Sequence, residues 1–190
     1  MVQSYLMNTL VEIGGGDNPG PRFGSVQRHI SVDTDFRALS SAALRVPDVI
    51  SQYGDATSLS DFPDGSVDIV LARNVFGDGL LGIPPDQKTI VIRDMLNDIK
   101  LASRVHENAN YIKLMMLGAA CRVLVDGGRL IVVERYSPDV ARRFFQDETT
   151  RTTGGLGIEK ARLSDVAPAN YVAAQASLSE PAVWLGTKNL

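Results

Sequence analysis

The sequence predicts a layered α/β domain in which a mainly parallel sheet is covered by helices on both faces. Strand-like apolar runs alternate with helical or loop segments along the chain, and neither a repeat nor a low-complexity segment interrupts them. The chain has 190 residues, of which 44% are hydrophobic, and this length suits one domain with a substantial core. We therefore expect residues 1–190 to form one unit, with an inserted helical segment at about 77–110.

The first strand ends in three consecutive glycines. The apolar run around Leu10 and Ile13 suits a buried strand, and the glycines at 14–16 let the backbone turn sharply and approach a ligand closely. A dinucleotide-binding G-x-G-x-x-G pattern counted from Gly14 would need its third glycine at Pro19, which disfavours a nicotinamide-dependent oxidoreductase. A small-molecule site is expected where this strand ends, and a flexible turn is the plain alternative.

The pattern that remains is an acid, one residue and then G-x-G, in the order Glu12-Ile13-Gly14-Gly15-Gly16. It resembles the first motif of the class I S-adenosylmethionine-dependent methyltransferases. That family usually has a further glycine two positions on, where this chain has Asn18, a residue that tolerates positive φ. Proline and glycine over residues 18–24 predict a short turn or abbreviated helix before the second strand. Backbone N–H groups of the glycine loop would then bind the methionine carboxylate.

The second and third strands each lead to a carboxylate. A strand from His29 ends at Asp33 and Asp35, about twenty residues after the first glycine, which is the spacing of a ribose-binding acid. We assign Asp33 to the ribose and keep Asp35 as second candidate; the plain alternative is that both only terminate a strand. Asp55, after Gly54, resembles the family's acid that faces the adenine amino group. Its alternative role is to cap a short helix.

The fourth and fifth strands follow from local chemistry. Residues 63–66 read Pro-Asp-Gly-Ser and predict a turn, and residues 68–72 predict a buried parallel strand. An apolar helix over 117–126 is expected to stop at the glycine pair 127–128, with the fifth strand directly after it. This last segment also resembles the family, and its expected role is structural.

The joint order of these segments implies the Rossmann-like sheet of that family, with seven strands in the order 3-2-1-4-5-7-6, helices on both faces and S-adenosylmethionine as cofactor. The residues that the resemblance places around the cofactor are Glu12, Gly14, Gly15, Gly16, Asp17, Asn18, Asp33, Thr34, Asp35, Asp55, Ala56, Arg73 and Asn74. No metal site is expected.

The long connection from 77 to 110 is the expected insertion. Its apolar positions, which are Ile92, Met95, Leu96, Ile99 and Ala102, have the spacing of one amphipathic helix. Long loops at the carboxyl edge of such a sheet are where ligands meet the protein. We interpret this segment as an acceptor-binding lid, and the alternatives are a helix that pads the sheet or contacts a second subunit.

The mechanism would need little from side chains, because a sulfonium already makes its methyl carbon electrophilic. Alignment of the acceptor and exclusion of water then do most of the catalysis. A hydroxyl acceptor would also need a base, and the candidates of suitable type are Asp78, His106, Glu134 and Tyr136. The sequence does not choose among them, and an amine acceptor would need none.

The last third of the chain predicts a helix and a hairpin. Ser137-Pro138-Asp139 opens a helix through Phe145, and residues 152–157 predict a loop. Residues 171–178 and 182–187 alternate well enough to form a terminal hairpin around residues 179–181.

Composition limits the partners and the compartment. The formal net charge is -3 and no basic tract appears, so we expect no nucleic-acid partner. The fourth strand also lacks the adenine-methylating signature of Asn or Asp followed by two prolines and an aromatic residue. Neither a membrane span nor a secretory signal is evident, and the single cysteine, Cys121, allows no disulfide within the chain. A cytoplasmic protein without a membrane partner is expected.

We therefore expect a methyltransferase that acts on oxygen or nitrogen of a small-molecule acceptor. Few residues precede the first strand, so either the site is unusually open or the inserted lid and a partner subunit, which could be a second copy of the chain, close it. A noncatalytic binding or scaffold subunit with the same fold is the alternative.

Overall fold

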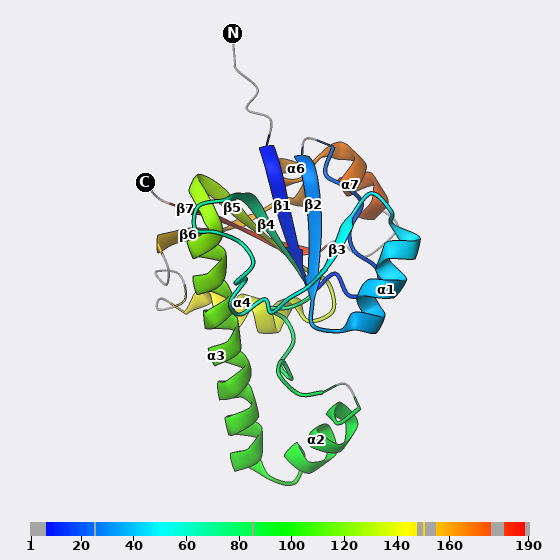
Figure 1. Ribbon diagram of the computed structural model, residues 1–190. Coiled ribbons are helices and arrows are strands. Elements are labelled where there is room, and N and C mark those ends of the chain that lie inside the picture. Colours follow the sequence, from blue (N-terminus) through cyan, green and yellow to red (C-terminus); the bar gives the residue numbers. More distant parts are fainter. Residues whose placement is uncertain are drawn as a thin grey trace.

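Figure 1 shows the computed structural model of the chain, which describes residues 7–24, 26–84, 86–147, 150, 155–175 and 181–188. Its elements in chain order are β1 (Met7–Ile13), β2 (Val26–Asp33), α1 (Phe36–Arg45), β3 (Ile50–Tyr53), β4 (Val67–Arg73), α2 (Lys88–Met95), α3 (Ile99–Val123), β5 (Leu124–Glu134), α4 (Pro138–Gln146), β6 (Leu156–Ala161), α6 (Leu163–Val166), α7 (Ala169–Gln175) and β7 (Ala182–Lys188).

The strands form one seven-stranded sheet in the order β3-β2-β1-β4-β5-β7-β6, which confirms the predicted order. Strands β1 to β5 pair in parallel, whereas β7 runs antiparallel between β5 and β6. The carboxyl ends of β1 to β5 therefore meet at one edge of the sheet. In open sheets of this kind, ligands bind at that edge.

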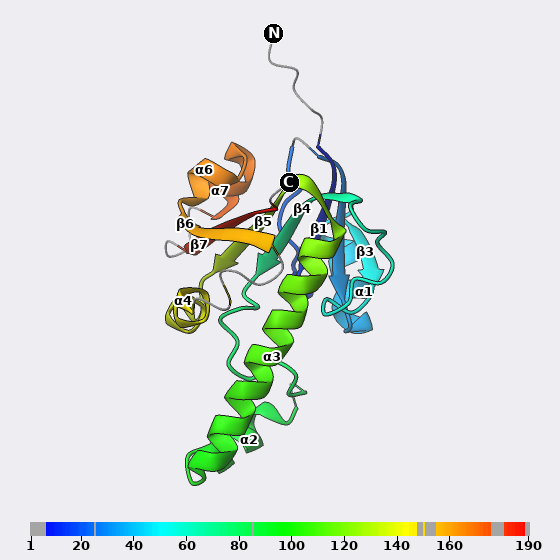
Figure 2. The ribbon, with the colours of Figure 1, turned by 90° about the vertical axis from the view of Figure 1, so that its left-hand side faces the viewer.

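Helices cover both faces of the sheet, as predicted. Successive strand residues point to opposite faces, so Val11 packs in the cluster with α3 and α4, and Leu10 packs in the cluster with α6 and α7. Figure 1 shows α3 on one side of the strands and α1 and α7 on the other, and Figure 2 shows the same arrangement with α3 in front. None of the described helices is both long and apolar enough to cross a membrane.

The short first crossover is confirmed. The described residues between β1 and β2 form turns and no helix, because proline and glycine prevent a long one. The space beside this loop is filled by α7: the rings of Phe23 and Tyr171 have centroids 5.0 Å apart, and the Asn170 side-chain amide donates to the Arg22 carbonyl at 2.7 Å. A segment from the far end of the chain thus supports the loop that follows β1.

The predicted terminal hairpin is wrong in its first strand. Tyr171 begins no strand but lies fully buried in α7, and the edge strand is β6, which starts at Leu156 inside the predicted loop. Leu156 and Ile158 are buried while Gly157 and Glu159 are exposed, a period of two that the preceding glycines obscured. Residues 152–154 of the predicted loop and 176–180 of the predicted hairpin lie outside the described residues.

The predicted single helix of the insertion is two helices, α2 and α3. The break covers residues 96–98, where the Asp98 carboxylate accepts from the backbone N–H groups of Lys100 and Leu101 at 2.9 and 3.1 Å. An aspartate at this position caps a new helix in preference to continuing the old one. Leu96 and Ile99 are consequently 82% and 85% exposed, so the periodic apolar residues do not form one buried face.

The helix before the fifth strand also ends earlier than predicted. α3 stops at Val123, and the glycine pair lies inside β5, where Gly127 has a φ of +74°. Val67 pairs with Leu124 and Ile69 already pairs with Arg129, so the extra residues form an irregularity that only glycine accommodates without strain. The predicted helix after Ser137 is confirmed as α4, although the Ser137 hydroxyl makes no capping hydrogen bond.

Candidate functional site

An open groove of about 890 Å³ lies at the carboxyl ends of β1 and β2. This size falls within the range of small-molecule sites. It brings together five of the residues predicted for the cofactor, and the chain after β2 supplies the rest of its lining. The lining residues are Gly16, Asp17, Asp33, Thr34, Asp35, Phe36, Arg37, Ala38 and Ser41.

The glycines of the loop after β1 serve different purposes. Gly14 has a φ of +78°, and a Cβ there would lie 2.1 Å from a methyl group of Val75 and 2.4 Å from the Arg73 carbonyl oxygen, so the loop passes β4 too closely for any side chain. Gly16 has a φ of +56°, but a Cβ there would meet no atom within 4 Å. The backbone at Gly16 therefore faces free space in the groove, where it could contact a ligand.

The buried carboxylate of Glu12 fixes the position of this loop through hydrogen bonds. Its carboxylate is 0% exposed, and both oxygens accept from the backbone N–H of Gly20 at 3.0 Å. One oxygen also lies 2.8 Å from Nε2 of His29, and the other accepts from the Arg73 guanidinium at 3.0 Å. Glu12 thus does not line the groove, and any effect on a ligand passes through the loop.

The side chains of the two predicted residues at the end of β4 also form hydrogen bonds with other parts of the protein. The Arg73 guanidinium donates to the Asn18 carbonyl at 3.2 Å as well as to Glu12. Asn74 has a φ of +53°, and its side-chain oxygen accepts from the backbone N–H of Arg135 at 3.0 Å. These residues join the loop after β1 to the ends of β4 and β5.

Asp33 and Asp35 both line the groove, but their environments differ. Asp35 is the N-cap of α1, because one of its oxygens accepts from the N–H groups of Arg37 and Ala38 at 2.8 and 3.2 Å. Asp33 accepts one hydrogen bond through Oδ1, from the backbone N–H of Asp35 at 2.8 Å. A carboxylate has about four acceptor sites, so Asp33 retains capacity for the two hydroxyls of a ribose.

Asp55 lies beyond the groove lining, next to the end of β2. The N–H of Gly54 donates to the Asp33 carbonyl at 3.1 Å, which places the chain after β3 beside Asp33. The exposed Asp55 carboxylate accepts from the N–H of Thr57 at 2.8 Å and begins a turn, so the helix-capping alternative is wrong. The next predicted residue, Ala56, packs partly buried against the core cluster of α3.

Phe36 is a groove residue that the sequence analysis missed. It is 72% exposed and lines the groove directly after Asp35. Exposed aromatic side chains beside a polar groove suit the flat face of a base. The signal in the sequence was an aromatic residue immediately after the acids of the second strand.

Glu134, a candidate base, is enclosed by the loop that follows β4. It is 1% exposed, and its carboxylate accepts from the backbone N–H of Phe76 at 2.7 Å. Burial raises its pKa to about 7, while backbone hydrogen bonds from Gly77, Phe76 and Val75 and the charge of Lys113 act in the opposite direction. A Cβ on Gly77 would lie 2.6 Å from the carboxylate, so this loop closely covers the Glu134 side chain.

The other candidate bases differ in burial and in their partners. Asp78 forms an ion pair with Lys88 at 2.8 Å and accepts from the N–H of Leu80. Tyr136 is 84% exposed. His106 lies on α3 and lines a second pocket, between α3 and α4, away from the groove. Asp78 and Glu134 both act on the charge of Lys113, and Gly79, the neighbour of Asp78, lines the same pocket as His106.

The sequence matches no protein-family model and no curated protein. Solved structures do share its fold. A methyltransferase from Pyrococcus furiosus superposes with a TM-score of 0.59 at 10% identity, covering 100% of this chain and 80% of the other. A chain from the complex between the Haloferax volcanii Trm112 methyltransferase activator and a methyltransferase gives 0.53 at 16% identity, with 96% and 83% covered. The chain thus has the Rossmann-like fold of the class I methyltransferases, as the resemblance implied.

A third similar structure corrects one expectation. A rRNA methylase from Streptococcus thermophilus has a TM-score of 0.51 at 11% identity, with 98% of this chain and 92% of the other covered. The exclusion of a nucleic-acid partner from net charge is therefore wrong, because an enzyme whose name refers to RNA has the same fold. Charge describes the long-range field of the molecule, whereas the acceptor is chosen by local groups.

Proposed function

We propose that this chain is an S-adenosylmethionine-dependent methyltransferase that binds its cofactor in the groove at the ends of β1 and β2. One observation carries the proposal: a glycine whose backbone faces open space and a carboxylate with free acceptor capacity line the same groove. These are Gly16 and Asp33. Their strands are neighbours in parallel register, with Ile13 opposite Val32, so the two groups are held by the sheet.

The residues present fit the parts of this cofactor. Backbone N–H groups of the glycine loop would bind the methionine carboxylate, and Asp33 would accept from both ribose hydroxyls. Phe36 would pack against the adenine ring, and Asp55 would accept from its exocyclic amine. Glu12 and Arg73 would act indirectly, because their hydrogen bonds fix the loop.

The bound cofactor would supply an electrophilic methyl group. The protein then has to hold a small-molecule acceptor in line with that group and keep water out. The rim formed by the ends of β4 and β5 is adjacent to the glycine loop through Arg73 and Asn74, so we place the acceptor there. The segment from 77 to 110 remains our proposed lid. It supplies no residue to the described lining of the groove, and α2 projects beyond the carboxyl edge in Figure 1.

Calorimetry with S-adenosylmethionine and its demethylated product tests the cofactor. We expect micromolar binding to the wild type and a loss of about tenfold or more in Asp33→Ala, since hydrogen bonds to a charged group contribute about 1.5–3 kcal/mol each. Gly16→Ala should weaken binding similarly, because its new methyl group would occupy the ligand's approach. Gly65→Ala is the matched control: Gly65 has a similar φ of +61° and does not line the groove.

The outcomes separate the alternatives. If the wild type binds neither compound, the fold serves as a scaffold and the proposal fails. Unchanged affinity in Asp33→Ala would move the cofactor out of this groove. A saturable fluorescence signal with a reduced nicotinamide cofactor would instead indicate an oxidoreductase.

A further inference from the structure

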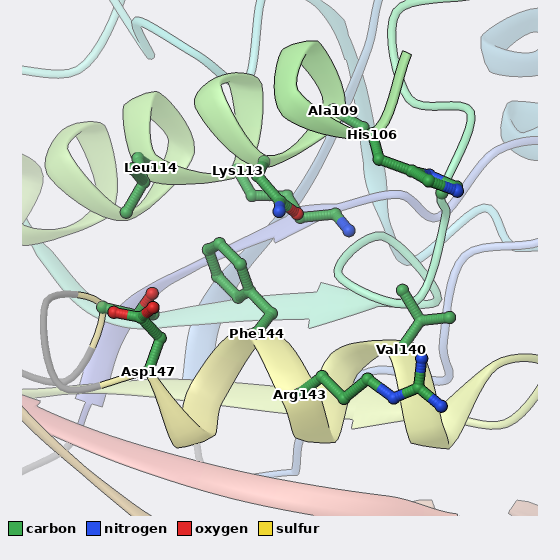
Figure 3. A pocket seen from close by; sticks show the side chains of 11 residues that line it. His106, Ala109, Lys113, Leu114, Val140, Arg143, Phe144 and Asp147 are labelled. Carbon is green, nitrogen blue, oxygen red and sulfur yellow. The ribbon is translucent and has the colours of Figure 1, made fainter. Parts of the chain in front are cut away.

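A second pocket of about 520 Å³ lies between α3 and α4 and is separate from the cofactor groove. Figure 3 shows side chains of the two helices facing one another across it, with Lys113 reaching from α3 above the ring of Phe144. His106 and Asn110 contribute from α3, Arg143 from α4, and Asp147 from the position directly after α4. The pocket is therefore partly basic, with one carboxylate at its margin.

Lys113 is the unusual member of this lining. Its side chain is 0% exposed, and its ammonium has no hydrogen-bond partner among the described residues. The nitrogen lies 5.5 Å from the centroid of the Phe144 ring, and this cation–π contact leaves the N–H groups of the amine without a hydrogen-bond acceptor. A buried amine without partners is costly, so an external group that accepts its hydrogen bonds would stabilise it.

The two carboxylates whose charges act on Lys113 do not accept a hydrogen bond from its ammonium. Asp78 is paired with Lys88, and Glu134 accepts from the backbone N–H groups of the loop after β4. Burial lowers the pKa of Lys113, and the charges of Asp78 and Glu134 oppose that change. An anion in the pocket would favour the charged amine further.

We propose that the pocket between α3 and α4 binds a carboxylate or phosphate group of the methyl acceptor, with Lys113 and Arg143 as its cationic ligands. This inference rests on the proposed methyltransferase function for the identity of the ligand. Gly79 joins the pocket to the loop after β4, and that loop leaves the carboxyl edge where the acceptor is placed. Asp147 at the margin would disfavour a large polyanion and suits a single anionic group.

Inorganic phosphate and acetate are the probes. Backbone amide NMR shifts of residues 106–114 and 140–147 should saturate on titration of the wild type with at least one probe. Lys113→Met should weaken this binding about tenfold or more, and Arg143→Gln several-fold, as expected for charge-assisted hydrogen bonds. Two surface variants serve as matched controls: Lys100→Met on α3 and Arg142→Gln on α4, whose arginine pairs with Asp139 outside the pocket.

Each outcome bears on the proposal. Saturation by phosphate alone or by acetate alone identifies the acceptor group, and loss of binding in both pocket variants but neither control supports the site. Absence of saturation with both probes overturns it, and so does equal binding by Lys113→Met and Lys100→Met. Arg143→Gln keeps the test valid if Lys113→Met does not fold. S-adenosylmethionine binding is measured in every variant: its absence from the wild type refutes the proposed function while leaving the anion result standing.

Discussion

Glu134 should make the protein less stable as the pH rises through neutrality. Its folded pKa of about 7 lies above the reference value of 4.5 for an unfolded chain, so the folded state binds more protons between these two pH values. Stability from this group is fully present below pH 4.5 and is lost as the pH rises to about 7. The difference in pKa corresponds to about 3 kcal/mol, and about 2–3 kcal/mol of it falls between pH 5 and pH 8.

Glu134→Gln removes this titration. The side-chain oxygen of glutamine can still accept from the N–H of Phe76, but its NH2 group cannot accept from the neighbouring N–H groups. The variant should therefore be less stable than wild type at pH 5. The deficit should shrink by about 2–3 kcal/mol by pH 8, because only the wild type loses stability over that range.

Urea unfolding at pH 5, 6, 7 and 8 measures this change. Glu159→Gln, which replaces an exposed glutamate on β6, is the control and should run parallel to wild type. If Glu134→Gln also ran parallel to wild type, Glu134 would not be the buried titrating group and the reasoning would be refuted.

Three further predictions concern the framework of the site. Gly14→Ala should lower the free energy of unfolding by about 3 kcal/mol, because residue 14 has a positive φ and a methyl group there would overlap the end of β4. Gly65→Ala should lower it by only about 1 kcal/mol. Equal losses in urea unfolding would contradict the close approach of the loop to β4. Asp35→Ala should destabilise α1 by about 1 kcal/mol in thermal melts, yet keep cofactor affinity within about twofold of wild type; a loss as large as that of Asp33→Ala would exchange their roles. Arg122→Met should cost about 1–2 kcal/mol, because its guanidinium binds several carbonyls of the turn before β4; an unchanged unfolding midpoint would show that the turn holds without it.

The sequence predicted those parts of the site that follow from strand order. Once β1 and β2 are parallel neighbours, the glycine loop and Asp33 must meet at one edge, and they do. Edge strand β6 was not predicted, because only four alternating residues follow a glycine-rich run. The alternation that predicted a strand at Tyr171 belongs instead to a helix that packs on Phe23. Local pattern cannot reveal that long-range contact, which decides between the two structures.

Lys113 illustrates what lies beyond sequence reasoning. It is one polar residue on a long helix whose pattern places many others in water. Its surroundings come from distant parts of the chain: the Phe144 ring on α4, and the charges of Asp78 and Glu134. The sequence contains the lysine and both helices, but burial depends on how two segments separated by a full strand meet. The same applies to Glu12, whose partners His29 and Arg73 come from the strands on either side.

The contacts of Glu12 explain why an acid beneath the loop is useful although it does not line the groove. Its carboxylate fixes the N–H of Gly20, and Arg73, bound to the same carboxylate, fixes the carbonyl of Asn18. The far end of the loop is thereby tied to β1 and β4, while the backbone at Gly16 stays uncovered. A loop already held in one conformation gives up little entropy when a ligand binds. Loss of the Glu12 carboxylate should therefore lower ligand affinity through a more mobile loop, and the lost binding should be accompanied by faster hydrogen exchange at Gly20.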